Sequence, residues 1–141
     1  MKIYFLSQAK ASKIEPNENM ALISIMDGSS TDFNFLKKWK NVLSLTFDDV
    51  DVQIYDYILF SEEQAKMILK FIEQLPKIVD VIVVHCWAGI SRSAAVAKFL
   101  SEYYHTTDFP SRYELYNKLV YSTLKKVWLV ETWNDAKGEE K

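Results

Sequence analysis

The sequence predicts an α/β domain with a central, mostly parallel sheet flanked by helices. Short runs rich in Ile, Val and Leu alternate with longer segments whose apolar residues recur at helical spacing. Strands that alternate with helices in this way are typical of parallel sheets. A capping box precedes one of the helical segments, which marks the start of a helix. The length of 141 residues suits one domain.

The apolar runs are expected to form the strands of this sheet. The last run is nearly all β-branched, so we expect it to be buried on both faces. Parallel sheets bind their ligands outside the carboxyl ends of the strands, so the segments that follow these runs are where we expect a site. The runs are Ile3–Leu6, Ala21–Met26, Val42–Phe47 and Val79–Val84.

Helices are expected between and after these strands. The capping box Ser61-Glu62-Glu63-Gln64 places a Ser hydroxyl at the N-cap and a Gln side chain three residues later. Apolar residues then recur at helical spacing as far as Leu75, and Pro76 ends the run. A further helix is expected to begin near Ser91, and another to span roughly Ser111 to Trp128.

The chain is expected to form one domain over residues 1–136, followed by a polar tail over residues 137–141. No apolar run approaches the roughly 20 residues that a membrane span needs. The N-terminal apolar stretch is too short for a secretory signal, so the default is the reducing cytoplasm, where a free thiol survives. We therefore expect a cytoplasmic protein without a membrane partner.

Composition excludes several classes of protein. Lys and Arg number 17 against 19 for Asp and Glu, so no nucleic-acid partner is expected. One cysteine rules out an intrachain disulfide framework, and with two histidines it also excludes a Cys/His metal cage. We expect no metal and no cofactor, and the sequence leaves the oligomeric state open.

The segment HCWAGISRS, residues 85–93, follows the β-branched strand and leads into a helix. A short loop that closes onto a helix N-terminus turns several backbone N–H groups toward one anion. Gly89 permits backbone angles that a side chain opposes, and Arg92 can present a planar fork to two phosphate oxygens. The same positive field favours the thiolate of Cys86, the form that attacks as a nucleophile.

This segment resembles the H-C-x5-R-[ST] signature of the cysteine-dependent protein tyrosine phosphatases. Its Gly-x-Ser-Arg-Ser ending resembles the dual-specificity branch, and the surrounding elements extend the resemblance from about Val42 to about Tyr104. Arg92 is one of two arginines and stands at the required offset from the single cysteine. The resemblance implies a protein tyrosine phosphatase-like fold and a small dual-specificity-like phosphatase that requires no metal.

The resemblance also implies a role for each residue of the segment. Cys86 would attack phosphorus to form a cysteinyl-phosphate, and Arg92 would hold the phosphoryl oxygens and stabilise the transition state. Ser93 would hydrogen-bond the thiolate and make it a better leaving group, while His85 would support Cys86 from behind. The residues that would line the phosphate are Trp87, Ala88, Gly89, Ile90, Ser91 and Arg92.

A leaving alkoxide or phenoxide needs a proton, and in this family an Asp about thirty to forty residues before the cysteine supplies it. The stretch LTFDDVD leaves the carboxyl end of a predicted strand and resembles the L-x-F-x-D-[IV] stretch of small bacterial members, which points to Asp49. Asp48 and Asp51 remain alternatives, and Asp56 lies in the same range. Without the cysteine loop, these aspartates would be read as a polar loop.

The function predicted from these features is hydrolysis of phosphomonoesters in a phosphorylated protein or a small molecule. No W-P-D acid loop is present, and a shallower pocket would admit phosphoserine and phosphothreonine as well as phosphotyrosine. Trp87 would either form a wall against an aromatic substrate or, like Ile90, pack against the sheet.

Other functions remain open at this point. An inactive phosphate- or phosphoprotein-binding module would keep the loop without turnover. RNA 5′-phosphatases and inositide phosphatases share the signature, but the former tend to be basic and the latter often carry lysines in the loop, which WAGIS lacks. A rhodanese-like sulfur transferase is disfavoured because its loop is usually one residue shorter.

Overall fold

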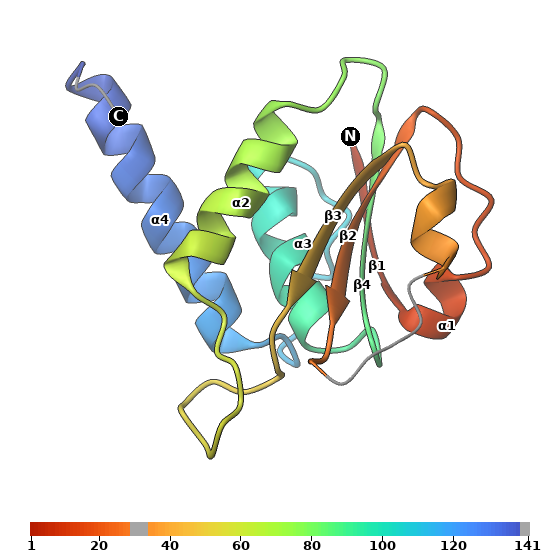
Figure 1. The fold of residues 1–141 in the computed structure, drawn as a ribbon. Helices are drawn as coiled ribbons and strands as arrows, with labels where there is room; N and C mark the ends of the chain where they lie inside the picture. Colours follow the sequence, from red (N-terminus) through yellow and green to blue (C-terminus); the bar gives the residue numbers. More distant parts are fainter. Residues whose placement is uncertain (29–33, 139–141) are drawn as a thin grey trace.

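The computed structural model describes residues 1–28 and 34–138. Its centre is a four-stranded sheet in the order β1-β4-β2-β3, and each pair of neighbouring strands is parallel (Figure 1). This arrangement confirms the predicted α/β class with a parallel sheet. The strands are β1 (Lys2–Ser7), β2 (Met20–Met26), β3 (Asn41–Thr46) and β4 (Val81–Cys86).

Strand β4 lies between β1 and β2 and is buried from Ile82 to Cys86, as its β-branched sequence predicted. Its bounds differ from the predicted Val79–Val84, because the strand begins and ends two residues later. As a result His85 and Cys86 belong to the strand, and Cys86 pairs with Ser7 of β1. The thiol is therefore held at the carboxyl end of a buried strand.

Helices cover both faces of the sheet (Figure 1). One face carries α2 (Glu62–Glu73), α3 (Arg92–Tyr103) and α4 (Lys118–Ala136), and the larger apolar core fills the space between them and the sheet. The other face carries the short helix α1 (Gln8–Ala11) and the 3₁₀ helix η1 (Asn34–Lys38). The loop after β3 and the starts of α3 and α4 meet at the carboxyl edge of the strands.

The capping box of α2 is confirmed in both directions. The Ser61 hydroxyl accepts a hydrogen bond from the Gln64 backbone N–H, and the Gln64 side chain accepts one from the Ser61 N–H. The helix ends at Glu73 rather than at Leu75, because a residue before proline is disfavoured in the helical region. The helix predicted near Ser91 is α3, which begins at the next residue.

The prediction of a helix over Ser111–Trp128 was wrong at both ends, because α4 spans Lys118–Ala136. Residues 111–117 instead form a non-helical segment that contacts the loop after β4. Within it, the Asn117 backbone N–H donates to the Ser91 carbonyl. The Asn117 side chain then caps the helix by accepting from the Val120 N–H.

Helix α4 ends in a C-cap at Lys137, and residues 139–141 of the predicted tail lie outside the described residues. The proposed domain boundary after residue 136 stays a prediction. In the part of the chain that the structure describes, no helix combines the length and apolar character needed to cross a membrane.

Candidate active site

The loop between β4 and α3, residues 87–91, curves around the sulfur of Cys86. The Gly89 backbone N–H donates to Cys86 Sγ over 3.3 Å, and Ser93 Oγ lies 3.2 Å from the same sulfur. Cys86 is 2% exposed, so its thiol forms the floor of the cavity above it. That cavity has a volume of ≈ 300 Å³. It is lined by Asp27, Asp49, Cys86, Trp87, Ala88, Ile90, Ser91 and Arg92.

Gly89 is required by the close packing of this loop against β1. Its φ is +71°, and an added Cβ would lie 2.3 Å from the Ser7 nitrogen and 2.5 Å from the Leu6 carbonyl carbon. The Gln8 N–H also donates to the Trp87 carbonyl and joins the two segments. The close approach that glycine permits is thus made to the backbone of β1, whatever anion the loop binds.

Arg92, the first residue of α3, is held by Asp27, a residue that the sequence reasoning missed. Its Nη1 donates to Asp27 Oδ1 over 2.6 Å and to the Phe47 carbonyl over 2.9 Å. Its Nε–H is buried and has no hydrogen-bond partner among the described residues. A buried donor without a partner is costly, so this N–H is an unsatisfied polar group within the site. Asp27 directly follows the buried strand β2, the same signal that drew attention to Asp48 and Asp49.

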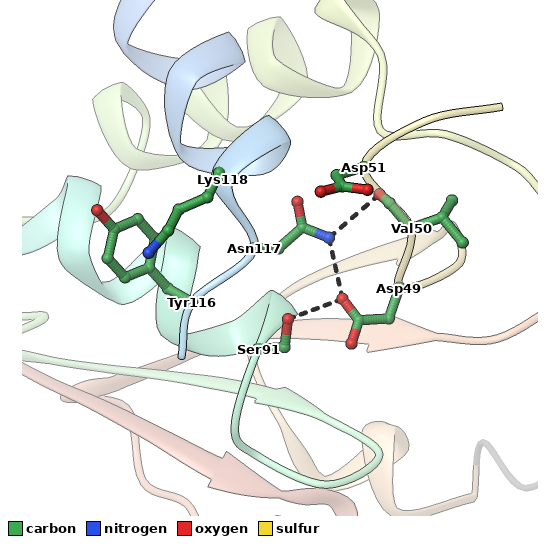
Figure 2. A pocket seen from close by; sticks show the side chains of 7 residues that line it. All are labelled: Asp49, Val50, Asp51, Ser91, Tyr116, Asn117 and Lys118. Atoms are coloured by element: carbon green, nitrogen blue, oxygen red, sulfur yellow. Dashed lines mark hydrogen bonds between the residues drawn. The ribbon is translucent and has the colours of Figure 1, made fainter. Parts of the chain in front are cut away.

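Of the aspartates considered as proton donors, Asp49 is the one that lines the cavity above Cys86. Its Oδ1 accepts hydrogen bonds from Ser91 Oγ over 2.8 Å and from Asn117 Nδ2 over 2.9 Å (Figure 2). Asp48 instead closes the base of its loop, because its carboxylate accepts from the Ile58 N–H over 2.7 Å. Asp51 faces a second pocket and Asp56 is exposed farther along the loop.

The second pocket, shown in Figure 2, also includes Asp49 in its wall and has a volume of ≈ 260 Å³. It shares Asp49 and Ser91 with the cavity above Cys86. Lys118, the basic side chain of this pocket, already has partners within the protein. Its Nζ lies 3.5 Å from the Tyr116 ring centre and donates to the Glu114 carbonyl. The lining residues are Asp49, Val50, Asp51, Ser91, Tyr116, Asn117 and Lys118.

His85 is fully buried behind Cys86, and its Nε2 lies 2.7 Å from Ser24 Oγ of β2. Burial lowers the pKa of His85 to about 4, although the Cys86 backbone acts in the raising direction; the nearby Arg92 charge adds to the lowering. The imidazole is therefore neutral at pH 7. Its predicted role as a support for Cys86 stays a prediction.

Tyr113 supports the loop that follows β4 from outside. Its hydroxyl donates to the Ile90 carbonyl over 2.6 Å. Burial, with a smaller contribution from Cys86, raises the pKa of Tyr113, so the phenol keeps its proton at neutral pH. This bond fixes the peptide group between Ile90 and Ser91.

Trp87 and Ile90 do not pack against the sheet. Trp87 is 67% exposed and Ile90 is 47% exposed, and both line the cavity above Cys86. The apolar rim that they form lies next to the thiol. In residues 1–28 and 34–138, no group of three or more His, Cys, Asp and Glu side chains is placed to hold a metal ion.

The four-stranded parallel sheet and the helices that flank it form a protein tyrosine phosphatase-like fold. One solved structure of this fold is the crystal structure of Tk-PTP in the active form, a protein tyrosine phosphatase. The two chains are 15% identical, with a TM-score of 0.57 over 90% of this chain and 91% of that chain.

At this identity the likeness concerns the fold. A match over 90% of the chain must extend beyond Tyr104, where the sequence offered a helical pattern alone. No family model and no curated protein matches the sequence.

Proposed function

We propose that this protein is a phosphatase that hydrolyses phosphomonoesters through a cysteinyl-phosphate intermediate. The observation that carries the proposal is the Cys86 thiol on the floor of a cavity whose walls include Arg92 and Asp49. The Gly89 N–H and the Ser93 hydroxyl both lie within hydrogen-bond distance of the sulfur, which suits a negatively charged nucleophile. Each chemical step of the proposed reaction therefore has a candidate residue at this cavity.

In the first step the Cys86 thiolate attacks phosphorus, a P–S bond forms and the P–O bond to the leaving group breaks. Asp49 gives its proton to the leaving oxygen. In the second step water attacks phosphorus and gives a proton to Asp49, the P–S bond breaks and inorganic phosphate departs. Ser93 donates to the sulfur as it leaves, and Arg92 holds the phosphoryl oxygens in both steps.

The proposed substrate is a phosphorylated protein or a small phosphomonoester. The exposed Trp87 beside the thiol supports an aromatic leaving group such as phosphotyrosine. Turnover of phosphoserine and phosphothreonine is proposed as well, in keeping with the dual-specificity resemblance. Relative rates on phosphotyrosyl and phosphothreonyl peptides test this, and strict preference for phosphotyrosine would contradict it. Cytoplasmic location also remains a proposal.

The experiment for the activity is hydrolysis of p-nitrophenyl phosphate. We expect the wild type to be active and Cys86→Ser to fall to background, because the serine hydroxyl is a far weaker nucleophile at neutral pH. Cys86→Ser should still bind inorganic phosphate, which shows that the cavity is intact. An inert wild type that binds phosphate would instead favour the binding-module alternative.

The proton donor is tested by the pH dependence of the rate. Asp49→Asn should lower kcat by about 10²–10³-fold and remove the basic limb of the profile, because an amide has no proton to give. Asp48→Asn and Asp51→Asn are matched controls that should keep this limb. If Asp49→Asn keeps it, another group is the acid.

A further inference from the structure

The loop that carries Asp49 and the loop that surrounds Cys86 are both hydrogen-bonded to one buried residue, Asn117. Its Nδ2 donates to Asp49 Oδ1 over 2.9 Å and to the Val50 carbonyl over 3.2 Å (Figure 2). Its backbone N–H donates to the Ser91 carbonyl over 3.1 Å. Its Oδ1 accepts from the Val120 N–H at the start of α4. Asn117 therefore ties together two loops and a helix.

These contacts exceed what a helix cap needs. A cap requires an acceptor oxygen, which Ser, Thr or Asp supplies as well as Asn. The amide nitrogen of Asn117 is a donor that capping does not use, and it is directed at the Asp49 carboxylate and the next carbonyl. Since Asn117 is 7% exposed, water competes little for these bonds. The amide donor of Asn117 therefore indicates a role in addition to helix capping.

The two donors leave the oxygens of Asp49 unequal. Asn117 Nδ2 and Ser91 Oγ both donate to Oδ1, while Oδ2 accepts no hydrogen bond from the described residues. In a protonated carboxyl, one oxygen is an acceptor and the other carries the proton. A proton on Oδ1 would lie close to the hydrogens that Asn117 and Ser91 donate to that oxygen, so we expect the Asp49 proton on Oδ2.

We propose that Asn117, assisted by Ser91, is the positioning residue that fixes Asp49 as a proton donor with its proton on Oδ2. The inference rests on the proposed phosphatase function and deepens it. The hydrogen bonds from Asn117 and Ser91 hold Asp49 in the wall of the Cys86 cavity, where a proton donor to the leaving group is required. A preorganised donor pays its ordering cost during folding rather than during the reaction.

The test separates positioning from capping by two variants that both keep a capping oxygen. Asn117→Ser removes the amide donor, and Asn117→Asp replaces it with a second carboxylate beside Asp49. Each is assayed on p-nitrophenyl phosphate and on phenyl phosphate, whose leaving phenol is less acidic and depends more on the donated proton. For Asn117→Ser we expect the loss in kcat/KM on phenyl phosphate to exceed that on p-nitrophenyl phosphate by about tenfold. Asn117→Asp should show a larger difference.

Two controls identify a merely structural effect. Ser61→Ala removes the N-cap of α2, which typically costs about 1 kcal/mol of stability, and should leave the ratio of the two rates at its wild-type value. In the Asp49→Asn background, Asn117→Ser should cause little further loss, because two residues that act through one proton are not additive.

The outcomes are distinct. Equal losses on both substrates, or full additivity with Asp49→Asn, would overturn the positioning role while an active wild type keeps the proposed function. A wild type inert toward both substrates would overturn the proposed function and this inference with it.

Discussion

Arg92 forms an ion pair with Asp27, because Arg92 Nη1 lies 2.6 Å from the Asp27 carboxylate. The guanidinium is buried, whereas the Asp27 side chain is 42% exposed, so water screens part of this attraction. In the proposed function, a phosphate dianion entering the cavity would meet both groups, since Asp27 also lines its wall. We therefore expect Asp27 to have two opposed effects on the proposed activity: it orients Arg92, and its charge repels an anionic substrate.

Asp27→Asn separates these effects, because the amide oxygen still accepts from Nη1 while the negative charge is gone. We expect vanadate to inhibit hydrolysis of p-nitrophenyl phosphate roughly threefold to tenfold more tightly than in the wild type, from one nearby charge at an intermediate dielectric. Asp27→Ala, which also removes the acceptor, should bind vanadate less tightly than Asp27→Asn.

The charge-matched control is Asp80→Asn, an exposed Asp just before β4 at the opposite edge of the sheet. It changes the net charge by the same amount and should leave the inhibition constant unchanged. Weaker inhibition of Asp27→Asn would mean that the charge of Asp27 is needed to hold Arg92 in place.

The two site residues that the sequence missed differ in whether they could have been found. Asp27 follows a buried apolar run at the carboxyl edge of the sheet, so the reasoning applied to Asp49 would have reached it. Asn117 stood within a predicted helix, and nothing in its neighbours shows that a helix starts there. Its importance comes from contacts with Asp49, Val50 and Ser91, which are distant in sequence.

At the scale of the elements, the loop between β4 and α3 depends on its fit against the end of β1. A methyl group on Gly89 would meet backbone atoms of Ser7 and Leu6, which cannot rotate away as a side chain can. Gly89→Ala should lower the free energy of unfolding by about 1–3 kcal/mol. It should also abolish vanadate inhibition, because the loop must move. Chemical denaturation and inhibition assays measure the two effects.

Gly138→Ala is the matched control for the backbone angle. Gly138 has the same φ of +71°, but nothing lies within 4 Å of its added Cβ. This variant carries the cost of the left-handed conformation alone, roughly 1–2 kcal/mol, and should keep wild-type inhibition. Wild-type inhibition in Gly89→Ala would contradict the requirement for a close fit of Gly89 against β1.

The elements were predictable where local sequence determines them. The α2 capping box depends on contacts between Ser61 and Gln64, which are close in sequence. The start of α4 was not predictable in this way. Residues 111–117 have helix-compatible spacing, but Tyr113 and Asn117 form bonds to the loop after β4 instead. Periodicity reports which residues suit a helix and cannot weigh tertiary bonds that compete with it.

At the scale of the whole molecule, the fold class followed from alternation of strands and helices, but the strand order β1-β4-β2-β3 did not. The order depends on which strands have neighbouring strands on both sides. Hydrophobicity does not distinguish these strands from the sequence, because several of the apolar runs are similarly hydrophobic. The 15% identity with Tk-PTP shows how little sequence the fold itself requires. Strand β4 carries both the fully buried His85 and the thiol of Cys86, so a charge on His85 would arise in the core and next to the site.

The buried His85 predicts how the stability of the domain responds to acid. His85 has its pKa lowered from 6.5 to about 4 by burial, so the folded protein resists protonation that the unfolded chain accepts. Above pH 6.5 the imidazole is neutral in both states and its contribution is complete. As the pH falls from 6.5 toward 4, the free energy of unfolding should decrease by up to about 3 kcal/mol, at about 1.4 kcal/mol per pKa unit.

His85→Gln removes the titrating group and keeps a side chain able to hydrogen-bond Ser24, so its unfolding free energy should vary less between pH 6.5 and 4. Urea denaturation at intervals across this range measures the slope. His105→Gln is the matched control, since it removes the other histidine, which is exposed. A slope that His85→Gln leaves intact would show that carboxylates elsewhere cause the acid sensitivity. A reduced slope would mean that protonation of His85, which lies in the same strand as Cys86, causes a measurable part of the loss of stability in acid.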